Sequence, residues 1–242
     1  MTSAAPATLR YESVASTMDL IHELGERGAP AGTVVVAAEQ TGGRGSRGRP
    51  WHSPRGGVWL TLLSRPSRAG TELLSLRAGL ALARALEVAC PGLRVGLKWP
   101  NDLMWEARKV GGVLLEVRWS GDDPAWAAVG VGINVTNPLP PDLATTAVAL
   151  AEHQAAPTPE ALLDLLLPGL RGLDGETPRL APEELAELRR RDWLRGRELT
   201  GPEAGVVEGI APDGALLVRR QDGARAELRA GTIRLAHPAG RP

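Results

Sequence analysis

Two hydrophobic patterns alternate along most of this chain, and together they predict a mixed domain of strands and helices. Short apolar or β-branched runs predict strands at 9–14, 33–38, 58–64, 93–97, 111–119 and 125–135. Apolar residues at helical spacing predict helices at 18–27, 71–89, 159–173 and 182–194. Because strands and helices are interspersed, we expect an α/β or α+β domain of roughly 190 residues.

The pattern changes near Arg195. Five short strands are expected in the tail, separated by Gly, Pro and Asp-Gly turns, at about 199, 205–210, 213–219, 224–229 and 233–235. Strands of this length and spacing are typical of a small five-stranded barrel. We therefore place a domain boundary near Arg195, and we find no internal repeat.

One segment, 39–56, has no apolar periodicity and is rich in glycine and arginine. Long loops inside compact domains are usually functional. Glycine exposes backbone N–H groups that can cradle an anion, and arginine adds forked donors. The alternative is a disordered basic loop that contacts RNA or nothing.

Composition narrows the classes of protein. The chain has 242 residues, 43% of them hydrophobic, with seven Trp, one Tyr and no Phe, so its core must be mainly Leu, Val and Ala. A formal net charge of zero argues against a general nucleic-acid or membrane-surface binder. The single cysteine, Cys90, excludes an internal disulfide and is expected to be a buried small side chain. Residues 1–10 do not resemble a secretory leader, and no apolar run is long enough to span a membrane, so we expect a cytoplasmic protein.

Lysine is confined to one short stretch. Of 28 basic residues only Lys98 and Lys109 are lysines. Lysine supplies a compact, strongly hydrated point charge, whereas arginine supplies a flat fork. The stretch 98–116 also holds Asn101-Asp102 and a Gly-Gly pair, so it predicts a site for a phosphate-bearing ligand. The alternative is that two surface lysines fell close together by chance.

Two further segments are candidates for ligand contact. Ser16-Thr17 stands where a strand meets a helix, and it is either a ligand contact or an ordinary N-cap pair. The run 129–135 ends near Asn134, which could reach a ligand from the end of its strand; the alternative is a glycine-rich strand packed on a helix. No G-x-x-x-x-G-K-[ST] loop and no protein-kinase signature occurs, so any ATP site has another architecture.

Four blocks, taken in order, resemble the signature of biotin protein ligases. They are Gly-Arg-Gly-Ser-Arg-Gly-Arg-Pro-Trp at 43–51, Lys-Trp-Pro-Asn-Asp at 98–102, Lys-Val-Gly-Gly-Val-Leu-Leu-Glu at 109–116 and Gly-Ile-Asn-Val at 132–135. The resemblance implies an α+β catalytic domain of the class II synthetase-like type over 1–194, with a mixed sheet and flanking helices. It implies an SH3-like barrel over 195–242. It also implies the form without an N-terminal DNA-binding domain, so no repressor activity is expected.

The implied activity is that of a biotin–[acetyl-CoA-carboxylase] ligase, which is AMP-forming. ATP and Mg²⁺ activate biotin as biotinyl-5′-AMP, and biotin then passes to a lysine of the biotin carboxyl carrier protein of acetyl-CoA carboxylase. The implied catalytic residues are Lys109, Arg44, Arg47 and Lys98. The implied biotin site is Ser16, Thr17, Gln40, Gly43, Arg44, Lys109, Gly112 and Gly130. The implied ATP site is Arg47, Trp51, Asn101, Lys109 and Asn134, with Asp102 as the Mg²⁺ ligand.

The chain departs from the family pattern at two positions. Ser46 replaces an arginine that helps to retain the adenylate, and Met18 replaces an asparagine of the biotin wall. We expect Arg47 to compensate for Ser46, because Gly45 and Gly48 let the loop re-aim its side chain.

Two other functions remain open from the sequence. A lipoate or octanoate ligase of the same fold is the nearest, and the polar trio Ser16, Thr17 and Gln40 favours a ureido ring over an aliphatic chain. A non-catalytic RNA-binding module is disfavoured by the zero net charge. No DNA and no membrane partner is expected, and both a monomer and a homodimer remain open.

Overall fold

A computed structural model describes residues 5–153 and 156–236 of the chain. The described residues leave out 1–4, which belong to the N-terminal segment considered as a secretory leader. They also leave out 237–242, at the end of the predicted barrel domain. No helix in the described part is long and apolar enough to cross a membrane.

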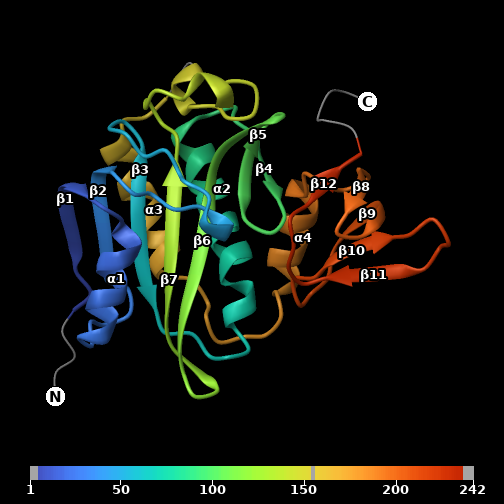
Figure 1. Ribbon diagram of the computed structural model, residues 1–242, viewed down its shortest axis with the longest axis horizontal. Coiled ribbons are helices and arrows are strands. Elements are labelled where there is room, and N and C mark those ends of the chain that lie inside the picture. The colour runs from blue at the N-terminus through green and yellow to red at the C-terminus, as the bar shows by residue number, and fades with distance from the viewer. Residues whose placement is uncertain (1–4, 154–155, 237–242) are drawn as a thin grey trace.

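The larger of two sheets has seven strands in the order β1-β2-β3-β7-β6-β5-β4 (Figure 1). β1 and β2 pair in parallel, and every other neighbouring pair is antiparallel, so the sheet is mixed as expected. The strands are β1 Thr8–Val14, β2 Val34–Gln40, β3 Val58–Ser64, β4 Val95–Lys98, β5 Asp102–Trp105, β6 Arg108–Ser120 and β7 Asp123–Ile133.

Helices cover both faces of this sheet. The helix α1, Thr17–Glu26, packs on β2, β3 and β7 over a small cluster that includes Ile21 and Leu63. The opposite face carries α2, Leu74–Ala89, and α3, Pro159–Arg171 (Figure 1). Successive side chains of a strand point to opposite faces, which is why the neighbours Leu62 and Leu63 belong to different clusters.

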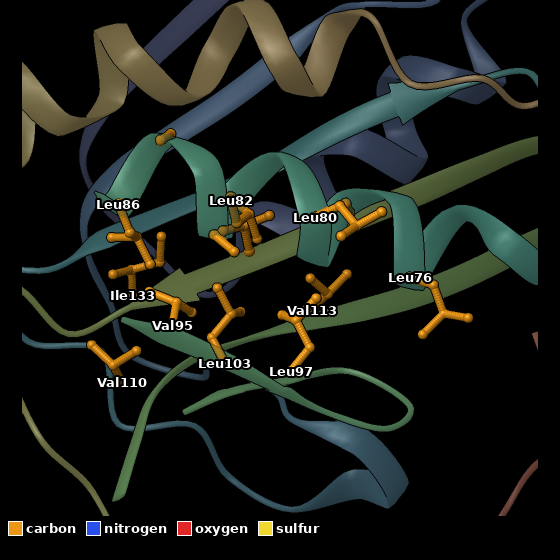
Figure 2. Close-up of a cluster of buried hydrophobic side chains, with 14 of the residues drawn as sticks. Leu76, Leu80, Leu82, Leu86, Val95, Leu97, Leu103, Val110, Val113 and Ile133 are labelled. Carbon is orange, nitrogen blue, oxygen red and sulfur yellow. The ribbon is translucent and has the colours of Figure 1, made fainter. Parts of the chain in front are cut away.

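The main core lies under α2. This helix has buried leucines at 76, 80, 82 and 86, which face apolar side chains of β4, β5, β6 and β7 (Figure 2). Leu82, Leu86 and Leu103 are fully buried. Burying one such side chain stabilises the fold by about 1.5–3 kcal/mol. This core fixes the strands that carry both lysines.

The second sheet has five antiparallel strands in the order β11-β10-β9-β8-β12. They are β8 Glu198–Gly201, β9 Ala204–Ile210, β10 Leu216–Arg219, β11 Arg225–Leu228 and β12 Arg234–Leu235. The predicted number of strands is confirmed, but no ladder joins β11 to β12 among residues 5–153 and 156–236. The sheet is therefore open where a closed barrel was expected. Its apolar residues join the main core, so both sheets share one interior.

Two elements differ from the prediction. The sequence predicts no strand directly after Lys98, yet β5 is a strand paired with β4 and β6. The sequence Pro-Asn-Asp, where β5 begins, is typical of a turn, and four residues are too few to show an alternation of apolar and polar side chains. The fourth helix, α4 Pro182–Arg191, ends before the expected 194 because Asp192 is extended and the Trp193 N–H donates to the Leu97 carbonyl instead. Short 3-10 turns lie at Ser46–Gly48, Thr71–Leu73, Pro141–Leu143 and Leu150–Glu152.

Candidate active site

A cavity of about 560 Å³ lies against the larger sheet and collects nearly all of the predicted site residues. Its walls come from the start of α1, the 39–56 loop, β4 to β7 and the segment 139–147, with Trp193 and Leu235 near the second sheet. The predicted residues in its lining are Ser16, Thr17, Gln40, Arg44, Trp51, Lys98, Asn101, Asp102, Lys109, Gly112, Gly130 and Asn134. Segments that are more than a hundred residues apart in the sequence thus meet in one space.

One part of the cavity is lined by a closed set of neutral hydrogen-bonding groups. Gln40 Oε1 accepts from the Thr17 backbone N–H at 2.9 Å and from Thr17 Oγ1 at 3.0 Å. Thr61 Oγ1 lies 2.8 Å from Thr17 Oγ1, and Gln40 Nε2 donates to Ser53 Oγ at 3.0 Å. Ser16 Oγ accepts from the Met18 N–H at 3.3 Å, so this serine caps α1 and also lines the cavity. The N-cap role of Ser16 is confirmed, and a ligand contact by Ser16 and Thr17 stays a prediction. This wall suits a neutral polar ring.

Another part of the cavity holds opposite charges. Asp102 on β5 forms an ion pair with Lys109 on β6, and Lys98 Nζ on β4 lies 3.9 Å from Asp102 Oδ2. Each side chain is between 22% and 28% exposed, so the charges are partly desolvated but still reachable. A Cβ on Gly112 would lie 3.2 Å from Lys109 Nζ, so glycine leaves room for the ammonium group.

Sheet register explains why these charges meet. Lys98 pairs with Asp102 across β4 and β5, and Asp102 pairs with Gly112 across β5 and β6. The register shifts between Leu103 and Met104, which brings Lys109 opposite Met104. A shift of this kind re-aims side chains beside a site.

The two asparagines are held by backbone groups. Asn101 Nδ2 donates to the Val113 carbonyl at 2.6 Å. Asn134 Nδ2 donates to the Val148 carbonyl at 3.3 Å, and Asn134 Oδ1 accepts from Asn137 Nδ2 at 3.2 Å. Both amides are thus fixed at the edge of the cavity rather than free to reorient.

The donor set limits how a metal ion could be held. No group of three or more His, Cys, Asp or Glu side chains suited to a metal occurs in the described residues. Asp102 is the one carboxylate among the described residues that line the cavity. Mg²⁺ is commonly held through one or two carboxylates, with water and substrate phosphates completing its shell. The cavity therefore fits a cation brought in with a phosphate ligand and does not form a cage of protein ligands.

The glycine–arginine loop is tied down at several points. Isolated antiparallel β-bridges pair Gln40 with Ser53 and Arg44 with Pro50. Arg44 Nη2 lies 2.7 Å from Asp19 Oδ1 on α1, and Arg44 Nε lies 3.7 Å from Glu116 Oε1 on β6. The hydrogen bond with Asp19 raises the pKa of Arg44 above its ordinary value. Arg44 is thus held at the cavity wall before any ligand anion arrives.

A buried histidine supports that anchor. Trp126 Nε1 donates to His22 Nδ1 at 3.1 Å, so a neutral His22 carries its proton on Nε2. His22 Nε2 lies 3.0 Å from Glu116 Oε2 and donates to it. Glu116 thereby accepts from His22 while it pairs with Arg44. This chain of contacts links α1 and the sheet to the loop.

Two predicted residues lie outside the cavity lining. Gly43 is buried in the loop, where an added Cβ would lie 2.5 Å from both Ser53 Oγ and the Trp51 carbonyl, so it shapes the loop. Arg47 is exposed and donates to Thr232 Oγ1 beside the second sheet. Arg49 lines the cavity instead, and its Nη2 donates to Ser46 Oγ at 3.1 Å. The arginine beside Ser46 in the cavity is therefore Arg49, not the expected Arg47.

Trp51 is oriented by neighbours on two sides. Lys109 Nζ lies 4.9 Å from its ring centroid, within cation–π range. Its indole nitrogen is buried and has no hydrogen-bond partner among the described residues. A Cβ on Gly132 would lie 2.5 Å from that nitrogen, so only glycine admits the ring here. An unsatisfied buried donor at a cavity wall is available to a ligand acceptor.

Sequence reasoning assigned no role to several residues that shape the site. Ser53 and Thr61 complete the neutral wall, His22 and Glu116 anchor the loop, and Trp193 lines the far end. Glu116 is the last residue of the block 109–116 that resembles the family signature, so the sequence itself pointed to it. Ser53 lies in the loop 39–56, which the sequence already marks as functional, whereas His22, Thr61 and Trp193 stand in ordinary helix, strand or linker sequence and carry no such signal.

Comparisons with known proteins agree on one family. The model of the biotin/lipoate A/B protein ligase family matches residues 11–134. The bifunctional ligase/repressor BirA of Bacillus subtilis is 34% identical over 226 residues, covering 88% of this chain and 69% of that protein. The biotin–[acetyl-CoA-carboxylase] ligase of Paracoccus denitrificans is 39% identical over 201 residues, covering 76% of this chain and 83% of that protein.

A solved structure is similar over almost the whole chain. The biotin protein ligase from Aquifex aeolicus, solved in complex with biotin and ATP, superimposes with a TM-score of 0.76 at 29% identity. The match covers 94% of this chain and 97% of that one.

Proposed function

The chain belongs to the biotin/lipoate A/B protein ligase family, and on that premise we propose that it is a biotin–protein ligase that activates biotin with ATP and transfers it to a carrier lysine. The observation that carries the proposal is one cavity with a neutral hydrogen-bonding wall and a lysine–aspartate cluster. A ureido ring suits the wall, and a carboxylate facing a triphosphate suits the cluster.

The first step joins two anions. A carboxylate oxygen of biotin bonds to the α-phosphorus of ATP, the bond from that phosphorus to the bridging α,β-oxygen breaks, and pyrophosphate leaves with the electron pair. The pentacoordinate transition state concentrates negative charge between carboxylate and phosphate. We assign Lys109 to that charge, because fixed cations act most strongly where charge develops. Lys98 would neutralise the phosphates from β4, on the other side of β5.

The neutral wall would hold the biotin rings. Thr17 and Gln40 supply a hydroxyl and an amide that are already oriented by each other, and Ser16 lies beside them. Gly112 and Gly130 permit close approach of the backbone; an added Cβ on Gly130 would lie 2.7 Å from Met18 Cε. Met18 thus contributes a flexible apolar surface to this wall where an amide was expected from the family pattern.

The nucleotide would lie over the cluster and beneath the loop. All four of Asn101, Asn134, Arg44 and Arg49 line the cavity. We assign the two asparagines to the phosphates and the two arginines to the loop side of the nucleotide. Trp51 would offer its ring or its free N–H to the adenylate. Mg²⁺, when bound with ATP, would withdraw charge from the phosphate oxygens, and Asp102 is the residue that would hold it. Asp102 must then exchange its lysine contacts for the ion.

The second step needs a carrier lysine at the cavity mouth. Its amine attacks the carbonyl carbon of the mixed anhydride, an amide bond forms, and AMP leaves. The carrier we propose is the biotin carboxyl carrier protein of acetyl-CoA carboxylase. We further propose a catalytic domain over 1–194 and a smaller domain over 195–242, and a cytoplasmic location, where ATP is available.

Isotope exchange tests the adenylation step directly. Labelled pyrophosphate should enter ATP when enzyme, Mg·ATP and biotin are present, and not when biotin is left out. If exchange requires lipoate or octanoate instead of biotin, the protein is a lipoate or octanoate ligase and not a biotin ligase. No exchange with any of these acids would contradict adenylation altogether.

A further inference from the structure

Trp193 stands outside every segment that the sequence associates with chemistry. It follows Asp192, the C-cap of α4, and precedes the second sheet. Its side chain nevertheless lines the cavity, close to Lys98. A residue of the connection between the two sheets therefore forms part of the active-site wall.

Two hydrogen bonds hold Trp193 against the lysine-bearing strands. Its backbone N–H donates to the Leu97 carbonyl at 3.1 Å, next to Lys98. Its indole Nε1 donates to the Glu106 carbonyl at 2.7 Å. Glu106 lies in the turn between β5 and β6 and has a φ of 53°, a strained value for a non-glycine residue. Trp193 is thus bonded both to β4, beside Lys98, and to the turn between β5 and β6.

The ring contacts two cations and the backbone of β4. Lys98 Nζ lies 5.8 Å from the ring centroid, and Arg197 Cζ lies 3.9 Å from it. Arg197 Nε also donates to the Trp193 carbonyl at 2.8 Å. A Cβ on Gly96 would lie 3.1 Å from Trp193 Cδ1, so glycine lets the indole rest close to the strand. The ring is held on several sides before it meets Lys98.

We propose that Trp193 is a positioning residue for Lys98, which it holds toward Asp102 and the triphosphate end of the cavity. The inference rests on the proposed function. A lysine stem is flexible, so an ammonium 3.9 Å from one carboxylate is not fixed by that contact alone. The aromatic face removes some of that freedom. Losing it should lower kcat/KM for ATP by about threefold to thirtyfold, the range that a cation–π contact supports.

The rarity of lysine allows a direct test of the geometry. Protein labelled with ¹³C at lysine Cε should give two lysine signals, one from each of the chain's two lysines, and Lys98→Met identifies them. Trp193→Leu should shift the Lys98 signal toward its value in an unfolded chain, since the ring current is lost, and should leave the Lys109 signal in place. Trp193→Phe keeps an aromatic face and should restore much of the Lys98 shift. Trp119→Leu, which removes a 52% exposed tryptophan of β6, is the matched control and should change neither signal.

A double-mutant cycle tests whether the contact serves catalysis. Trp193→Leu should reduce kcat/KM for ATP in the wild-type background but by less than twofold in the Lys98→Met background, while the KM for biotin changes little. A role confined to folding would give the same loss in both backgrounds and would be seen in the melting temperature of both.

The outcomes separate the two proposals. A Lys98 signal that does not move in Trp193→Leu overturns the positioning role, whatever the enzyme does. A signal that moves without any loss of kcat/KM also overturns it. A wild-type enzyme that forms no biotinyl-AMP contradicts the proposed function. In that case the Lys98 signals of wild type and Trp193→Leu, each compared with and without ATP, still decide whether Trp193 positions Lys98.

Discussion

Lys109 has three close neighbours at the end of its side chain, and they leave room for a compact ammonium group. It pairs with Asp102, lies 4.9 Å from the centre of the Trp51 ring, and has the backbone of Gly112 beside its end. The planar fork of arginine is wider and cannot occupy the same point. The residue therefore has a steric reason to be lysine.

We predict that Lys109→Met lowers the rate of biotinyl-AMP formation by about 10²–10³-fold, the usual effect of removing one preorganised group from a transition-state site. Lys109→Arg should lose at least about tenfold. Quenched-flow measurement of adenylate formation gives both values, and urea unfolding shows whether stability has changed. An arginine variant with the wild-type rate would contradict the assignment.

Retention of the adenylate is a second prediction at this scale. Arg49 lines the cavity beside Ser46, whereas Arg47 points to Thr232. A charge-assisted hydrogen bond is worth about 1.5–3 kcal/mol, so Arg49→Ala should release biotinyl-AMP roughly tenfold to a hundredfold faster. Arg47→Ala is the matched control. Faster release from Arg47→Ala than from Arg49→Ala would restore the expectation drawn from the sequence.

Residue types were easier to predict than their partners. The two lysines and the Asn-Asp pair stand out in the sequence because lysine is so rare in it. Which arginine of the loop faces the cavity depends on the 3-10 turn Ser46–Gly48, where Arg47 has a φ of 64°. No periodic pattern reports a single left-handed residue, so the loop arginines could not be ranked from sequence alone.

At the scale of elements, α2 and α4 are joined by a network of charges. Arg191 on α4 lies 2.6 Å from Glu87 on α2 and 2.9 Å from Glu187, and Arg84 pairs with Glu187 as well. Burial acts to raise the pKa of both carboxyls, but the arginine hydrogen bonds and charges, together with the Val95 N–H at Glu87, outweigh it, and each pKa lies below its ordinary value of 4.5. The folded state therefore binds fewer protons than the unfolded state near that pH.

The stabilisation from this network should be fully present above about pH 4.5 and should be lost as the pH falls further. Arg191→Met should lower the free energy of unfolding at pH 7 by about 2 kcal/mol, because it removes charge-assisted bonds from the half-buried Glu87 and the buried Glu187. Urea denaturation at pH 7 and pH 3.5 measures the effect. Arg190→Met, an exposed neighbour on the same helix, should change little at either pH. An equal loss in both variants would contradict the role of the network.

The loop 42–56 should respond to ligand. Its glycines make ordering entropically unfavourable, and ligand anions supply partners for its arginines. Hydrogen exchange over this segment should slow when biotin and Mg·ATP are added, most of all around Ser46–Gly48, which lacks the bridges of the loop ends. Equal exchange with and without ligand would contradict this.

Most elements were predictable from the sequence, including the short strands of the second sheet, but β5 was not. The helix α2 and strands β3 and β7 follow from periodicity because they bury a complete face. The four-residue β5 is defined by its pairing with β4 and β6 rather than by its own pattern. The site depends on this short strand, which is why its register could not be read in advance.

At the scale of the whole molecule, two tryptophans join the sheets at the active site. Trp99 is buried next to Lys98. Its indole N–H donates at 2.9 Å to the carbonyl of Gly214, in the turn between β9 and β10 of the second sheet. Trp193 makes the reverse connection, from the linker to the lysine-bearing hairpin. The division into two sheets was predictable from strand spacing. Their shared core and these contacts were not, because they join residues about a hundred positions apart.

The most direct measurement of the central claim uses the intact chain with a biotin carrier domain that has not been biotinylated. After incubation with biotin and Mg·ATP, the intact mass of the carrier should rise by one biotinyl group on one lysine, with AMP and pyrophosphate formed in step. A lipoyl domain offered in parallel should stay unmodified. An unchanged carrier mass, modification of the lipoyl domain alone, or production of ADP in place of AMP would contradict the account.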